Sequence, residues 1–158
     1  MVIIRFFKIF PFFLLFVLWG GLALAETDLW TKLQQGDFLS IEAEWLPRAE
    51  QGEIEAQLFM GHLESIRDKH SNAAKWYKRA ASKGNAVAQT LLANQYLSGK
   101  GVVRDAARAY AWYDLAAGQG HLNAIRARDL VARHMSEEQL NEAMKLIQSW
   151  KHGDIETN

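Results

Sequence analysis

The sequence has 158 residues and contains no cysteine, so it can form no disulfide, no thiolate metal site and no lipid-modified cysteine. Only two prolines occur, Pro11 and Pro47, and helix-forming residues dominate everything after Asp28. No alternating apolar and polar run rich in β-branched residues is present, so no strand is expected. Lysine and arginine together number 18, as do aspartate and glutamate, and no basic cluster stands out. Nucleic acid is therefore not expected as a partner.

The amino-terminal stretch differs in kind from the rest of the chain. Two basic residues, Arg5 and Lys8, precede an apolar run that ends in Ala23-Leu24-Ala25. This pattern predicts a secretory signal peptide over residues 1–25, because small side chains at Ala23 and Ala25 suit cleavage after Ala25. A periplasmic or secreted location is therefore expected, most simply in a Gram-negative envelope.

An uncleaved membrane anchor is the alternative, because residues 6–25 reach about the 20 residues that a bilayer requires. A membrane contact is expected only if this segment is retained. Cleavage would remove two basic residues and no acidic ones, which leaves 16 lysines and arginines against 18 aspartates and glutamates. The mature chain would then be slightly acidic.

Two related decapeptides, WYKRAASKGN from Trp76 and WYDLAAGQGH from Trp112, lie 112 − 76 = 36 residues apart. A recurrence of this length is typical of stacked helical repeats, in which each unit buries its apolar face against its neighbours. Glycines separate the periodic stretches, and residues able to cap a helix precede several of them. These marks predict helices over 28–35, 38–51, 53–66, 71–83, 85–98, 105–118, 121–134 and 136–151, with caps at Asp37, Ser71, Asn85, Asp105 and Ser136.

The repeated pattern resembles the Sel1-like repeat, a relative of the tetratricopeptide repeat. The resemblance rests on Ala88, Leu92, Ala93, Tyr96, Gly99, Gly101, Val102, Asp105, Ala109, Trp112, Tyr113, Ala116, Ala117 and Gly120. The preceding unit matches less well: it has Glu64 where an aromatic residue is preferred, and Gly52 to Gly84 spans 84 − 52 = 32 residues. Its turn between helices is therefore expected to be shorter.

The resemblance implies an all-α fold, a right-handed α/α solenoid of two to three Sel1-like helix pairs. The solenoid domain is expected over residues 26–151, followed by a disordered tail at 152–158. The segment that begins Ser136-Glu137-Glu138-Gln139 combines a capping box with an amphipathic helix, and it is expected to cover the end of the core.

The paired aromatic residues at Trp76 and Trp112 are interpreted as packing rather than as a ligand-stacking site. Each pair is followed by two alanines that let a neighbouring helix approach, while the large rings fill the space between helices. Truncation of Trp112 is therefore expected to unfold the protein rather than to remove a ligand.

No catalytic residue, metal site or cofactor is expected. The five histidines form no HExxH pair and have no helical spacing of three or four, and Gly99-Lys100-Gly101 lacks the rest of a phosphate-binding loop. The serines lack a strand-turn-helix context. The chain is therefore predicted not to be an enzyme.

Function is expected on the concave face that the first helix of each pair lines in this family. Its predicted binding residues are Glu55, Leu58, His62, Val87, Thr90, Asn94, Asn123 and Arg126. Such a mixed polar and apolar stripe suits an extended peptide, so the leading hypothesis is an exported adaptor that binds protein or peptide. The alternatives are a cell-envelope enzyme or enzyme inhibitor acting on cell-wall-related molecules, and a membrane-tethered assembly factor if the amino-terminal segment stays attached.

Overall fold

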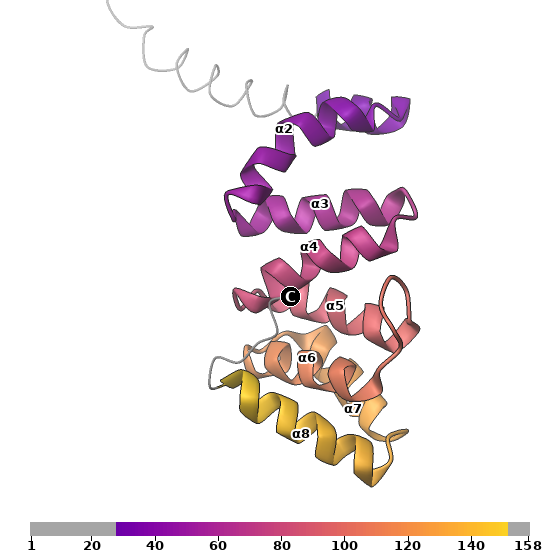
Figure 1. Cartoon of the computed structure of the whole chain (residues 1–158), viewed down its shortest axis with the longest axis vertical. Helices are drawn as coiled ribbons and strands as arrows, with labels where there is room; N and C mark the ends of the chain where they lie inside the picture. Colours follow the sequence, from indigo (N-terminus) through magenta and orange to yellow (C-terminus); the bar gives the residue numbers. More distant parts are fainter. Residues whose placement is uncertain (1–27, 152–158) are drawn as a thin grey trace, which may run out of the picture. The chain divides into compact units, whose positions relative to one another are not determined.

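The structure is a computed structural model, and it describes residues 28–151. They fall into two compact units, residues 28–43 and residues 44–151, each described by itself. Every regular element within them is a helix (Figure 1). After helical residues 28–35 come α2 Phe38–Glu50, α3 Ile54–Ile66, α4 His70–Ser82, α5 Ala86–Ser98, α6 Ala106–Gly118, α7 Leu122–Ala132 and α8 Glu137–Lys151. The unit boundary falls within α2.

Several helix ends lie where the sequence predicted them, because the expected caps form. The Asn85 side chain accepts the Ala88 N–H at 2.9 Å, and the Asp105 carboxylate accepts the Arg108 N–H at 2.9 Å. Ser136 and Gln139 form the expected capping box, in which each side chain accepts the other's backbone N–H.

The prediction of Ser71 as a cap is wrong. Helix α4 begins one residue earlier, at His70, with Lys69 at the cap position and no side-chain cap. The Lys69 carbonyl already accepts the N–H groups of Asn72 and Ala73, both at 3.0 Å, so Ser71 lies inside the first turn. The largest difference at a helix end is in α7, which stops at Ala132 rather than at residue 134.

Within residues 44–151, successive helices pack in pairs: α3 on α4, α4 on α5, α5 on α6 and α6 on α7. Alanines at helix contacts let the backbones approach closely, as at Ala80 and Ala116, which are fully buried. The last helix, α8, packs on α6 as expected, and its Trp150 ring lies 4.4 Å from the Trp112 ring between centroids (Figure 1). The fold is an all-α solenoid closed at this end by a capping helix.

The aromatic pairs pack as expected in the second repeat and differently in the first. Trp112, Tyr113 and Tyr77 are buried, but Trp76 is only half-buried. The Arg79 guanidinium covers the Trp76 ring at 4.5 Å from its centroid. The difference arises because α8 covers Trp112, so the expectation of equal burial for the two tryptophans is corrected.

Buried glutamines join one repeat to the next. Gln57 donates its side-chain N–H to the Ala49 carbonyl at 3.1 Å, and Gln89 donates to the Ala81 carbonyl at 3.2 Å. Both members of each pair are 32 residues apart from their counterparts, 89 − 57 and 81 − 49. These bonds fix the register in which a first helix meets the end of the preceding second helix.

None of the helices in the described part of the chain combines the length and the apolar character that crossing a membrane requires.

Candidate functional site

A groove of about 350 Å³ lies between the first helices of the two repeats, α3 and α5, and we call it the inner groove. It is lined by His62, Ser65, Tyr77, Leu91, Asn94, Gln95, Ser98 and Lys100. Two of these residues, His62 and Asn94, were predicted from the sequence, and they occupy equivalent repeat positions because 94 − 62 equals the 32-residue spacing.

Each of these two exposed side chains is held by a buried tyrosine from the second helix of its own repeat. The Tyr77 hydroxyl lies 3.2 Å from His62 Nδ1, and the Tyr113 hydroxyl donates a hydrogen bond to Asn94 Oδ1. Tyr77 and Tyr113 are themselves equivalent, 113 − 77 = 36 residues apart. The fold therefore repeats one device: a core tyrosine that orients a polar group at the groove.

The protonation of these tyrosines decides what the groove presents. Burial raises the pKa of Tyr77 to about 12, against a smaller opposing effect of its hydrogen bond with Ser65, and burial also raises the pKa of Tyr113. Both hydroxyls therefore keep their protons at neutral pH. Since Tyr113 donates to the Asn94 oxygen, the amide nitrogen is left to donate to a ligand. The same arrangement at Tyr77 puts the proton of a neutral His62 ring on Nε2.

The rest of the groove adds further donors and an apolar wall. Lys100 lies in the turn after α5 and contributes a cation, and Leu91 contributes an apolar surface. Ser98 spends its hydroxyl proton on the Asn94 carbonyl, at 2.8 Å. Gln95 is 8 % exposed, and no hydrogen-bond partner for its side-chain oxygen is found among the described residues. The groove is thus richest in donors, which suits the carbonyl and carboxylate oxygens of a ligand.

One predicted binding residue, Thr90, is not on an open face. Its side chain is 9 % exposed, and its hydroxyl donates to the Ala86 carbonyl at 2.8 Å and lies 3.1 Å from His121 Nδ1. His121 precedes α7 and therefore covers this position, so Thr90 joins two repeats. The expectation of an exposed Thr90 is corrected.

The remaining predicted binding residues lie outside the inner groove. Leu58 is half-buried and packs against the core. The other four are exposed on α3, α5 and α7 but do not line the groove: Glu55, Val87, Asn123 and Arg126. The predicted cleavage residues Ala23 and Ala25 lie outside the described residues.

Sequence reasoning missed most of the groove lining. Leu91, Asn94, Gln95 and Ser98 recur at spacings of three and four, so they share one helix face, and this signal was available. Lys100 was not accessible in the same way because it lies in a turn. Tyr77 was interpreted as packing alone, whereas its hydroxyl also reaches the groove.

Among residues 28–151, no three or more histidine, aspartate or glutamate side chains come together in a way that could hold a metal ion.

A stack of helix pairs with a polar groove along its first helices defines a helical-repeat protein, here an all-α solenoid. A family model of the Sel1 repeat matches residues 54–85 and residues 86–121. Residues 54–121 are therefore two Sel1 repeats, and the resemblance inferred from the sequence is confirmed. The first spans 32 residues and the second 36, the two spacings already seen between glycines.

The fold is also similar to a solved structure, the crystal structure of a protective antigen of uropathogenic Escherichia coli strains that displays an SLR fold. The TM-score is 0.64 and the sequence identity is 29%. The match covers 70% of this chain but only 25% of the antigen, so this chain spans about a quarter of the antigen's length. No protein with a curated functional description matches the chain.

Proposed function

We propose that this protein is an exported adaptor whose inner groove binds an extended segment of another protein. Sel1-repeat helical proteins are commonly protein-interaction scaffolds, and their fold is typically a non-enzymatic one. The observation that carries the proposal is the pair of exposed groups, His62 and Asn94, each oriented by a buried tyrosine.

An extended peptide matches what the groove presents. A strand-like segment carries a backbone carbonyl about every 3.3 Å, and successive carbonyls point to opposite sides, so one side offers acceptors at regular intervals. The donors of Asn94 and Lys100 can meet such acceptors, while Leu91 contacts an apolar side chain. Because tyrosines already fix His62 and Asn94, little side-chain freedom is lost on binding.

The substitution Asn94→Asp tests this role directly. It keeps the oxygen that accepts from Tyr113 but replaces the donor amide nitrogen with an acceptor, so a peptide carbonyl would meet an oxygen instead of an N–H. We expect partner binding to weaken by about tenfold or more, because an unpaired polar group costs about 1 to 3 kcal/mol. The measurement is affinity capture from envelope extract, with quantitative mass spectrometry of the proteins retained by each variant.

The matched control is Asn141→Asp, which makes the same chemical change at an exposed position of α8, away from the groove. Partners of the inner groove should be retained by the wild type and by this control and depleted with Asn94→Asp, at equal melting temperatures. Equal capture by all three proteins would contradict the assignment of this groove.

Export is the second part of the proposal, and it rests on the sequence of residues 1–25. Expression in a Gram-negative host followed by intact-mass measurement of the envelope fraction tests it. We expect a chain that begins at Glu26, because Ala23 and Ala25 provide the small side chains required for cleavage. A full-length mass in the membrane fraction would instead support the anchored alternative.

A further inference from the structure

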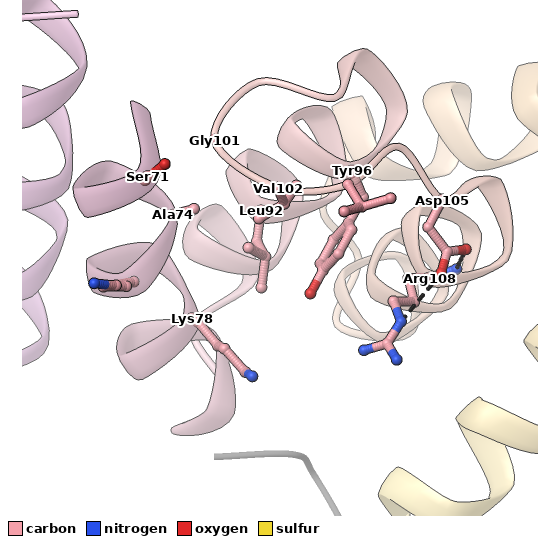
Figure 2. Close-up of a pocket in the computed structure, with 11 residues that line it drawn as sticks. Ser71, Ala74, Lys78, Leu92, Tyr96, Gly101, Val102, Asp105 and Arg108 are labelled. Atoms are coloured by element: carbon pink, nitrogen blue, oxygen red, sulfur yellow. Dashed lines mark hydrogen bonds and ion pairs between the residues drawn. The ribbon is translucent and has the colours of Figure 1, made fainter. Parts of the chain in front are cut away.

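A second groove, of about 550 Å³, lies between the second helices of the two repeats, α4 and α6, and we call it the outer groove (Figure 2). Its floor is formed by Leu92 and Tyr96, which lie on a different side of α5 from Asn94 and Gln95. The walls and the end are formed by Ser71, Ala74, Lys75, Lys78, Gly101, Val102, Val103, Asp105 and Arg108.

The charge of the outer groove has one predominant sign. Lys75 and Lys78 project from α4 and Arg108 from α6, whereas Asp105 is the one carboxylate in the lining. Asp105 accepts the Arg108 backbone N–H at 2.9 Å and forms an ion pair with the Arg108 guanidinium at 3.1 Å. Three cations against one carboxylate leave an excess of two positive charges, in a chain whose overall formal charge is zero.

Between the cations the floor is apolar and aromatic. Leu92 is 1 % exposed, Ala74 is buried beside it, and the Arg108 guanidinium lies 5.9 Å from the centroid of the Tyr96 ring. The turn at Gly101 closes one end, since the place of a side chain there is taken by the His70 carbonyl. A recess of this kind accepts an apolar side chain and surrounds it with positive charge.

We propose that the outer groove binds an acidic extended segment of a partner protein, in which carboxylates flank an apolar side chain. The apolar side chain would lie over Leu92 and Tyr96, and the carboxylates would meet Lys75, Lys78 and Arg108. A segment of this composition complements both the charge and the floor of the groove. The proposal does not depend on the inner groove, because the two share no lining residue.

The test uses the full chain and a short fluorescein-labelled peptide in which glutamate alternates with leucine, with binding followed by fluorescence anisotropy. We expect saturable binding that weakens as salt rises, and little binding of a matched peptide with glutamine in place of glutamate. The double variant Lys75→Glu with Lys78→Glu should weaken binding by about tenfold or more, because like charges then face each other.

The matched control is Arg133→Glu with Lys145→Glu, which makes the same change in net charge at exposed positions outside the groove. It should leave binding within about twofold of the wild type. Asn94→Asp should also leave binding unchanged, which separates this site from the inner groove. Thermal melts of all variants should coincide, since the substituted residues lie at the surface.

Three results would overturn the proposal. Equal loss in both double variants would show attraction by net charge alone. Equal competition by a single-stranded oligonucleotide would show a general polyanion site. Binding that occurs only after deletion of residues 152–158, whose sequence includes Asp154-Ile155-Glu156, would assign the groove to the chain's own residues rather than to a partner.

Discussion

Replacing Trp112 with alanine is expected to lower the free energy of unfolding by about 3 to 5 kcal/mol. The ring is 2 % exposed and stacks on Trp150, so its removal leaves a cavity where α6 meets the capping helix α8. Because a domain of this kind has a total stability of about 5 to 15 kcal/mol, much of the population should unfold under mild conditions. Urea unfolding followed by circular dichroism measures the change.

The first repeat offers a matched control, since Trp76 occupies the equivalent position. Its ring is half-buried and covered by Arg79 rather than by a capping helix. Trp76→Ala should therefore cost about 1 to 2 kcal/mol, clearly less than Trp112→Ala. Equal costs would mean that α8 contributes little to holding Trp112.

The helices could be predicted from the sequence because their ends carry local signals. Asn85 and Asp105 cap as expected, and Gly99 takes the left-handed conformation that ends α5. These interactions span three or four residues, so the sequence alone contains them. Ser71 failed for the same local reason: the cap position at Lys69 needs no side-chain acceptor, and nothing in the residue types distinguishes the two starts.

The candidate site could be predicted only where the repeat register determines it. Counting 32 residues links His62 to Asn94, and both line the inner groove. The same counting put Thr90 on the open face, but a neighbouring repeat covers it through His121. Burial by a later segment depends on how repeats pack, which a single helix face does not reveal.

Two grooves on different sides of α5 give a physical basis for an adaptor. The inner groove presents oriented donors beside Leu91, and the outer groove presents cations around Tyr96. A segment rich in carbonyl acceptors and a segment rich in carboxylates would therefore select different faces. The same two repeats could then hold two segments at once without competition for side chains.

The turn that closes the outer groove supplies the last test, through Gly101→Ala. Gly101 has φ +76°, and a Cβ there would collide with the His70 carbonyl, so both the backbone conformation and the space oppose a side chain. The turn cannot easily move aside, because its Arg104 side chain donates to the Leu97 carbonyl at 3.1 Å. We expect a loss of about 2 to 4 kcal/mol, combining backbone strain with overpacking. Gly84→Ala is the control: its φ is +87° but the space is open, so urea unfolding should show only about 1 kcal/mol of strain, and equal losses would place the cost in the backbone alone.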